Sequence, residues 1–265
     1  MPSELANQVV VIIGGTTGLG LSAARALVSA GARVVVVGRT KESADLALAE
    51  LGSAARTLVG DATQPETAVN AIRIALDSFG GFHSLYHVAG GSGRKMGDGP
   101  LHEITDAGWT ATLDLNLKSL FFSNRAAIQQ FLKQGGGGAI LNMGSVLGQS
   151  PSPRFFSTHA YATAKAAIVG LSQSAAAYYA PQNIRINVIA PALVATPMSR
   201  RAQENTEILN FIRTKQPLDG GRIGRPEDLD AAAIFLLSPA ARFVTGQVLA
   251  VDGGWTLSEG QYDPA

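Results

Sequence analysis

Tyr161 and Lys165 are the residues of this sequence whose types and spacing most clearly point to chemistry. Residues at i and i+4 on a helix lie next to each other on one face. A free phenol has a pKa of about 10 and is a poor base near neutral pH. A neighbouring ammonium stabilises the phenolate, so the pair is able to transfer protons. The same spacing also arises by chance on solvated helix faces, and other motifs must decide between the two interpretations.

A glycine-rich segment follows the first apolar run of the chain. Residues 8–13 predict a strand and residues 19–29 predict a helix, with the pattern GxxxGxG between them. Such a turn places backbone N–H groups and a helix N-terminus against a phosphate. A flexible turn without a ligand is the alternative. If the turn binds a phosphate, the expected contacts are Gly14, Thr16, Thr17, Gly18, Leu19 and Gly20.

Short apolar runs alternate with helical stretches along the chain, which is typical of an α/β protein with a parallel sheet. The predicted strands are 8–13, 33–37, 58–59, 84–88, 139–141, 184–189 and 248–251. The predicted helices are 19–29, 41–51, one capped by Thr63, 106–134, 160–180 and 226–237. We therefore expect one Rossmann-type, doubly wound domain over residues 1–265, with about seven strands. The segment 192–222 interrupts the alternation and is expected to form a lid over the substrate.

Composition excludes several classes of protein. The chain has 265 residues, 46% of them apolar, and a net charge of +1, so nucleic acid is an improbable partner. It has no cysteine, and its four histidines are scattered, so we expect no metal site. The N-terminus lacks a signal pattern and no apolar run reaches membrane-spanning length. We expect a cytoplasmic protein that does not bind membranes.

The end of the second predicted strand bears on the choice of cofactor. An acidic residue at this point binds the ribose 2′-hydroxyl of NAD, but here Gly38 is followed by Arg39. A guanidinium binds a 2′-phosphate, so Arg39 favours NADP over NAD. The alternative is that Arg39 lies on a solvated edge or stacks on adenine.

Taken together, these motifs resemble the short-chain dehydrogenase/reductase family over nearly the whole chain, from Val9 to Trp255. Further landmarks follow in the family's order: Asp61, Ala89-Gly90, Asn116, Asn142-Met143-Gly144-Ser145, Asn187, Pro191 to Thr196 and Val251-Asp252-Gly253-Gly254. The chain departs from the pattern at His87-Val88, where the family has two asparagines, so support for the sheet must come from elsewhere. The interval between Ser145 and Tyr161 is slightly longer than usual, which leaves Phe155 and Phe156 as pocket, interface or loop-packing residues.

The resemblance implies a catalytic set of Asn116, Ser145, Tyr161 and Lys165. Tyr161 would exchange a proton with the substrate oxygen, and Ser145 would orient that oxygen. Lys165 would lower the pKa of Tyr161 and hold the nicotinamide ribose, while Asn116 would anchor a water. The implied cofactor contacts, beyond the glycine-rich turn and Arg39, are Asp61, Ala62, Ala89, Gly90, Gly91, Tyr161, Lys165, Pro191, Val194 and Thr196. The resemblance also implies a homotetramer with helices 106–134 and 160–180 at one interface.

The expected function is oxidation of a secondary alcohol, or reduction of the ketone, with a nicotinamide cofactor. We favour NADP and the reductive direction. Two alternatives remain: an NAD-dependent degradative alcohol dehydrogenase, and a non-catalytic dinucleotide-binding sensor or scaffold with the same fold. The sequence does not identify the substrate, although Arg200 and Arg201 in the lid segment could meet an anionic group or simply be solvated.

Overall fold

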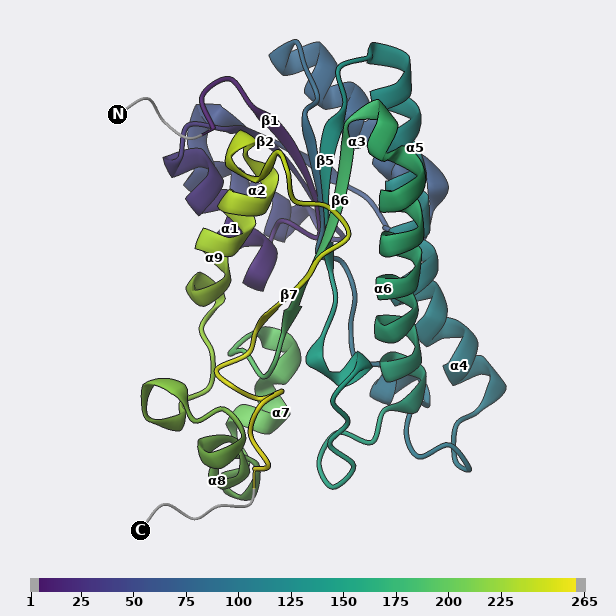
Figure 1. Cartoon of the computed structure of the whole chain (residues 1–265), viewed down its shortest axis with the longest axis vertical. Helices are drawn as coiled ribbons and strands as arrows, with labels where there is room; N and C mark the ends of the chain where they lie inside the picture. Colours follow the sequence, from purple (N-terminus) through teal and green to yellow (C-terminus); the bar gives the residue numbers. More distant parts are fainter. Residues whose placement is uncertain (1–4, 261–265) are drawn as a thin grey trace.

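Seven parallel strands form one sheet in the computed structural model, which describes residues 5–260 (Figure 1). The strands are β1 (Val9–Ile13), β2 (Arg33–Gly38), β3 (Ala55–Val59), β4 (Ser84–His87), β5 (Gly138–Met143), β6 (Ile184–Pro191) and β7 (Val248–Val251), in the order β3-β2-β1-β4-β5-β6-β7. The predicted α/β, doubly wound fold is confirmed. The first four residues, on which the expectation about a signal pattern rests, lie outside the described part of the chain.

Alternating side chains of each central strand enter two separate apolar cores. In β1, Val10 and Ile12 belong to the core on one face of the sheet, whereas Val9, Val11 and Ile13 belong to the core on the other. Successive side chains of a strand point to opposite faces, so a strand covered on both sides must be apolar throughout. This is why the run Val-Val-Val-Ile-Ile is completely buried.

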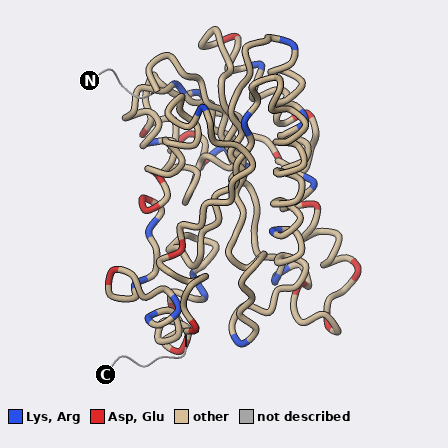
Figure 2. Tube along the Cα trace, in the orientation of Figure 1, with Lys and Arg blue, Asp and Glu red and all other residues tan. Residues whose placement is uncertain are grey.

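Helices cover both faces of the sheet, as Figure 1 shows. Helices α1 (Gly18–Ser29), α2 (Lys41–Leu51) and α9 (Asp230–Leu237) pack on one face, and α3 (Pro65–Phe79), α5 (Ser119–Gln134) and α6 (His159–Tyr179) on the other. Positions of Lys and Arg are interspersed with those of Asp and Glu along the trace in Figure 2. No helix within residues 5–260 is long and apolar enough to cross a membrane.

The helix predicted over residues 106–134 has a wider turn near its middle. Helix α4 (Asp106–Leu113) continues through a π-helical turn, Asp114–Lys118, into α5. Asn116 lies in this turn and is fully buried. A π-turn inserts one extra residue into the hydrogen-bonding pattern and re-aims its side chains. It therefore turns Asn116 toward the sheet.

Two predicted helix starts need correction. The cap of α3 is Gln64 rather than Thr63, because the Thr63 N–H is bonded to the carboxylate of Asp61 at 2.9 Å in a preceding turn. The helix expected from Pro226 begins as a 3₁₀ turn, Pro226–Leu229, and becomes α-helical only at Asp230.

The expected lid segment forms short helices beyond the C-terminal edge of the sheet. It contains a 3₁₀ turn (Pro197–Ser199), α7 (Arg200–Gln203), α8 (Thr206–Lys215) and a second 3₁₀ turn (Leu218–Gly221). Ile208 and Ile212 of α8 pack with Val146 and Trp255 in a third apolar core, separate from the two cores of the sheet. Figure 1 shows α7 and α8 together at one end of the molecule.

Candidate active site

The site lies where the order of the strands reverses, between β1 and β4. In α/β sheets, ligands bind in the crevice outside the carboxyl ends of the strands at such a point. The two strand ends are close together here, because the Ala89 N–H donates to the Ile13 carbonyl at 2.8 Å. A Cβ added to Gly14 would lie 2.7 Å from the Ala89 nitrogen, closer than real contacts allow. Gly14 is therefore required for this approach.

The glycine-rich turn forms a cradle of backbone groups at the start of α1. A Cβ on Gly20 would lie 2.0 Å from the Gly14 carbonyl oxygen, so glycine is needed for the chain to turn back on itself. Thr17 caps α1 without a side-chain hydrogen bond, and the first turn holds no acidic residue. The helix N–H groups are thus available to an anion. These features fit the pyrophosphate of a dinucleotide.

The other residues expected around this cradle have distinct positions. Thr16 packs against Gly38 of β2, where a Cβ would lie 2.1 Å from its hydroxyl oxygen. Leu19 points into the core beneath α1. Thr196, from the segment after β6, lies over the turn, with its Cβ 3.7 Å from a Cβ added to Gly18.

Arg39, Asp61 and Ala62 lie at the ends of β2 and β3, beyond the cradle. These strand ends are neighbours, since the Gly60 N–H donates to the Gly38 carbonyl at 2.9 Å. Arg39 is exposed, and it forms no ion pair within the described residues. Asp61 is also exposed, and its carboxylate accepts the Thr63 N–H. Its predicted adenine contact and its turn role are therefore compatible.

Tyr161, Ser145 and Lys165 converge at the end of β5. Tyr161 and Ser145 share a side-chain hydrogen bond. Ser145 follows β5, and its hydroxyl also accepts the Leu147 N–H at 3.2 Å. The Lys165 ammonium lies 5.5 Å from the centroid of the Tyr161 ring and donates to the Met143 carbonyl at 2.8 Å. One helix and one strand end thus bring together the three residues predicted from their order in the sequence.

Burial sets the ionisation of this group. Burial lowers the pKa of Lys165 to about 7, because only 3% of the residue is exposed and no carboxylate faces it. Burial also raises the pKa of Tyr161, and the Ser145 hydrogen bond opposes that rise only in part. The direction for Tyr161 is opposite to the lowering expected from Lys165. The reason is that the amine binds a backbone carbonyl and lies over the ring, while desolvation penalises the phenolate.

Asn116 is bound to the turn that follows β4. Its side-chain oxygen accepts the Gly91 N–H at 3.0 Å, and its amide donates to the carbonyls of Gly91 and Thr112, each at 2.9 Å. A Cβ on Gly90 would lie 2.7 Å from the Asn116 oxygen and 3.6 Å from the Lys165 nitrogen. Asn116, Gly90 and Lys165 therefore meet at one point, with the Asn116 amide occupied by backbone groups.

Two residues of this site were not identified from the sequence. The buried carboxylate of Asp98 accepts the N–H groups of Ala160 and Tyr161, both at 3.0 Å, and so caps α6 from a distant loop. His87 is buried and hydrogen-bonded through Nδ1 to Ser123 at 2.7 Å and through Nε2 to Ser119 at 3.4 Å. The expectation that support for the sheet comes from elsewhere needs correction, because His87 itself links β4 to α5 through these bonds. No local signal marks Asp98, because its partners are more than sixty residues away.

The far wall of the site comes from β6 and the loops around it. Pro191 ends β6, and Val194 is buried and bridges to Gly224. Phe155 and Phe156 pack in the third core. The ring of Phe156 lies edge-on to Trp255, and the ring centroids of Phe155 and Phe211 are 5.1 Å apart. Both aromatic residues therefore belong to the wall between the Ser145 loop and the lid segment.

Comparisons with known proteins agree with this architecture. A family model described as enoyl-(acyl carrier protein) reductase matches residues 14–256. Galactitol 2-dehydrogenase (L-tagatose-forming) of Cereibacter sphaeroides is 35% identical over 248 residues, covering 93% of this chain and 94% of its own. The inactive 2-(S)-hydroxypropyl-CoM dehydrogenase 2 of Xanthobacter autotrophicus is 40% identical, covering 88% of this chain and 99% of its own.

A solved structure extends the likeness to three dimensions. A short-chain type dehydrogenase/reductase from Mycobacterium ulcerans superposes with a TM-score of 0.88 at 32% identity, covering 96% of this chain and 91% of that one. The match in sequence, in fold and in the order of the motifs spans nearly the whole chain. The protein is therefore a member of the short-chain dehydrogenase/reductase family, an oxidoreductase of the kind that acts on CH–OH groups.

Proposed function

We propose that the protein interconverts a secondary alcohol and a ketone by hydride transfer with a nicotinamide cofactor, with Tyr161 as general acid and base. The observation that carries the proposal is the meeting of Tyr161, Ser145 and Lys165 beside a cradle that fits a pyrophosphate. The cofactor supplies or accepts the hydride. The protein binds the cofactor, orients the substrate oxygen and moves the proton.

The state of Tyr161 supports the reductive direction. Because burial raises its pKa, the phenol keeps its proton near neutral pH and is ready to donate it to a carbonyl oxygen. Ser145 would hydrogen-bond the same oxygen and stabilise the negative charge that builds there. In the oxidative direction the same tyrosine would take the proton from the alcohol, which requires stabilisation of the phenolate by Lys165.

Lys165 and Asn116 would serve as the support for this proton transfer. An amine with a pKa of about 7 can hold or release a proton at neutral pH. We assign two roles to Lys165: it holds the nicotinamide ribose, and it takes part in the proton path. The Asn116 amide is bonded to Gly91 and Thr112, so we assign it the positioning of the Gly90–Gly91 turn. Any water on the proton path would then bind to the backbone of the π-turn.

The surroundings of Arg39 support NADP as the cofactor. Neither Gly38 nor Thr40, its two neighbours, carries a carboxylate that would repel a 2′-phosphate. The hydroxyls of Thr16, Thr40 and Ser43 form a cluster beside it, with Thr40 bonded to Ser43 at 2.9 Å. Guanidinium and hydroxyl groups are suitable partners for a phosphate. An NAD-dependent degradative dehydrogenase is the second candidate if Arg39 only stacks on adenine.

Two of the comparisons are a reason to test other functions for this protein. One relative is named as inactive, which keeps a non-catalytic dinucleotide-binding role under consideration. The family model carries the name of an enoyl reductase, an enzyme that acts on a carbon–carbon double bond. The Ser145–Tyr161 pair, which offers two donors to one oxygen, suits a carbonyl better. Galactitol 2-dehydrogenase, whose name denotes oxidation of a secondary alcohol, supports the same choice.

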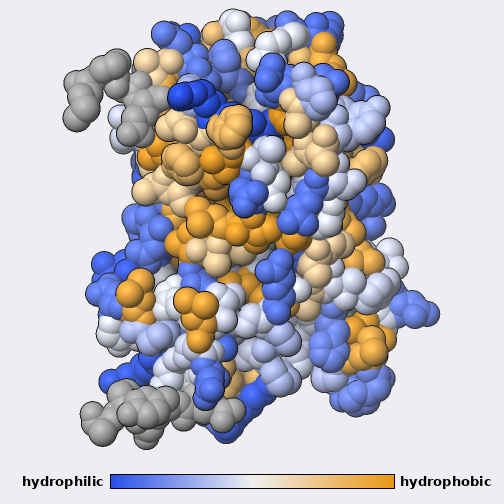
Figure 3. Space-filling view, in the orientation of Figure 1, coloured by the Kyte–Doolittle hydropathy of each residue, from blue (hydrophilic) through white to orange (hydrophobic). Residues whose placement is uncertain are grey.

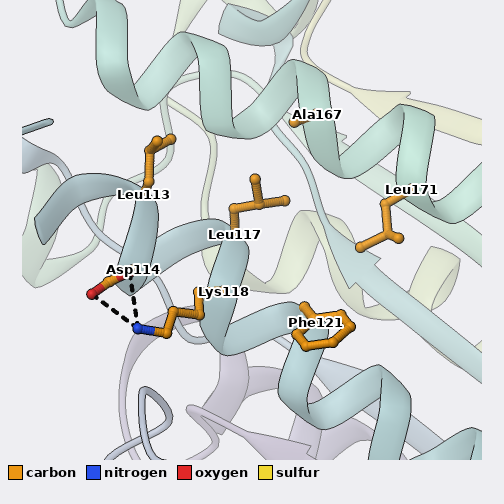
Figure 4. A pocket seen from close by; sticks show the side chains of 7 residues that line it. All are labelled: Leu113, Asp114, Leu117, Lys118, Phe121, Ala167 and Leu171. Atoms are coloured by element: carbon orange, nitrogen blue, oxygen red, sulfur yellow. Dashed lines mark hydrogen bonds and ion pairs between the residues drawn. The ribbon is translucent and has the colours of Figure 1, made fainter. Parts of the chain in front are cut away.

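We also propose that the enzyme is a cytoplasmic homotetramer. A mainly apolar hollow lies between the π-turn region and α6 (Figure 4), lined by Leu113, Leu117, Phe121, Ala167 and Leu171 together with the ion pair of Asp114 and Lys118. A second apolar area lies in the middle of the face shown in Figure 3, over the part of the molecule where Figure 1 labels α9 and β7. Phe235 of α9, Leu249 of β7 and Phe243 between them are exposed. Two distinct self-complementary patches are what a tetramer built from dimers requires.

The first prediction concerns proton transfer. Tyr161→Phe should lower kcat/KM by about a hundredfold or more on any ketone or alcohol that the wild type turns over, because the proton donor is lost. Turnover is followed by the absorbance of the reduced nicotinamide over a panel of ketones, alcohols and an enoyl thioester. Tyr178→Phe, at an exposed position of the same helix, is the control and should retain full activity. Wild-type rates in Tyr161→Phe would refute the proposed role.

Arg39→Asp tests the choice of cofactor. We expect the ratio of kcat/KM for NADP to that for NAD to fall by about tenfold or more, because a carboxylate repels the 2′-phosphate. Arg73→Asp makes the same charge change on the exposed side of α3 and should leave the ratio as it is. An unchanged ratio in Arg39→Asp would show that the Arg39 guanidinium does not bind the 2′-phosphate of NADP.

The pKa of Lys165 predicts how stability depends on pH. Its folded pKa of about 7 lies below the ordinary value of 10.5, so the unfolded chain binds more protons between these values. Stability should therefore rise as the pH increases through this window. Without added dinucleotide, Lys165→Met should weaken that rise in denaturant unfolding, whereas Lys41→Met, at an exposed position of α2, should not. Equal slopes in the wild type and Lys165→Met would contradict the low pKa.

The oligomer is tested at the apolar hollow. Phe121→Asp should convert tetramers to smaller species in light scattering, because a carboxylate would be buried in the interface. Leu46→Asp places the same charge on an exposed leucine of α2, away from the hollow, and should leave the mass unchanged. A monomeric wild type, or a tetramer that survives Phe121→Asp, would disprove this interface.

A further inference from the structure

Two arginines from distant segments meet at a single backbone carbonyl beside the proposed site. Arg94 lies in the 3₁₀ turn Gly93–Met96, soon after β4, and Arg201 lies in α7 of the lid segment. The Nη2 groups of both donate to the Phe155 carbonyl, at 3.1 Å from Arg94 and 3.0 Å from Arg201. The loop between Ser145 and Tyr161 is thus held by positive charge from two sides.

Neither guanidinium of this pair forms an ion pair with a carboxylate in the described part of the chain. By contrast, Arg154 on the same loop is paired with Glu207. The charge of Asp98 acts on Arg94 and raises its pKa, but the two oxygens of Asp98 accept the N–H groups at the start of α6. Burial and the charge of Arg201 lower the pKa of Arg94, so the two cations repel each other.

The segments that carry the pair also border the proposed site. The loop that begins with Arg94 contains Asp98, which binds the backbone N–H of Tyr161 at 3.0 Å. Phe155 packs in the same apolar core as Val146, the residue after Ser145. The two guanidinium groups are therefore held on the loop that joins Ser145 to Tyr161.

We propose that Arg94 and Arg201 form an anion subsite that binds a carboxylate on the substrate, so that the enzyme acts on hydroxy or oxo carboxylic acids. One donor of each arginine is bonded to Phe155, and the remaining N–H groups are available to an oxyanion. Arginine binds carboxylates through paired charge-assisted hydrogen bonds, which are stronger where water is partly excluded. This inference rests on the proposed function and specifies its substrate class.

Binding of non-reactive ligands tests the subsite without turnover. Benzoate and hexanoate are compared with benzamide and hexanamide by calorimetry, on the enzyme saturated with dinucleotide. We expect the acids to bind about tenfold more tightly than the amides, and Arg94→Gln or Arg201→Gln to abolish that preference. Arg200→Gln, which removes the same charge from the neighbouring position, should preserve it, and Arg94→Lys should preserve part of it.

The contrary results are distinct. Equal binding of every acid and amide, or no binding of any acid, overturns the subsite. A variant that weakens acid and amide equally shows that the arginines only fasten the loop, which also overturns it.

Turnover separates this inference from the proposed function. Oxo acids of increasing chain length are compared with their methyl esters, and the acids should have the lower KM at one length. If esters and acids react equally well, the oxidoreductase proposal stands and the subsite fails. If no ketone or alcohol of any class reacts, the proposed function fails, while a preference of the arginines for acids in calorimetry would still support an anion site.

Discussion

The site depends on the burial of one amine at the end of β5. Lys165 has lost nearly all contact with water and has a backbone carbonyl as its hydrogen-bond acceptor. Removing a charged amine from water is costly, and it lowers the pKa of that amine toward neutrality. The same enclosure disfavours the phenolate of Tyr161. Lys165 can therefore gain or lose a proton near pH 7, whereas Tyr161 stays protonated until a ligand stabilises its phenolate.

The sheet determines where this enclosure can occur. The strands are apolar on both faces, and one core covers each face of the sheet. Polar side chains that take part in catalysis are therefore confined to the ends of the strands. The ends of β1, β4 and β5 contribute Gly14, the Gly90–Gly91 turn and Ser145, at the reversal of strand order where α/β sheets bind ligands. Two helical segments complete the site. The π-turn between α4 and α5 supplies Asn116, and the first turns of α6 supply Tyr161 and Lys165.

Sequence patterns predicted those parts of the molecule that local physics determines. Hydrophobic runs gave all seven strands and the glycine spacing gave the turn, because both act over a few neighbouring residues. The order of motifs pointed to Ser145, Tyr161 and Lys165, which the structure brings together at the end of β5. What escaped prediction is non-local: the capping of α6 by Asp98, the bonds of His87 to Ser119 and Ser123, and the upward pKa of Tyr161. Each depends on which segments pack together, and no spacing along the chain encodes that.

The position of Trp255 gives the molecule an internal optical probe. Its indole is almost completely buried and packs edge-on against Phe156 and Phe211. The ammonium of Lys215 lies 5.7 Å from the centroid of the Trp255 ring. These neighbours come from the Ser145–Tyr161 loop and from α8. Any separation of the two segments would expose the ring to water and change its emission. Intrinsic fluorescence can thus follow, in real time, the separation of the Ser145–Tyr161 loop from α8. The second tryptophan, Trp109, is more exposed and contributes a background signal.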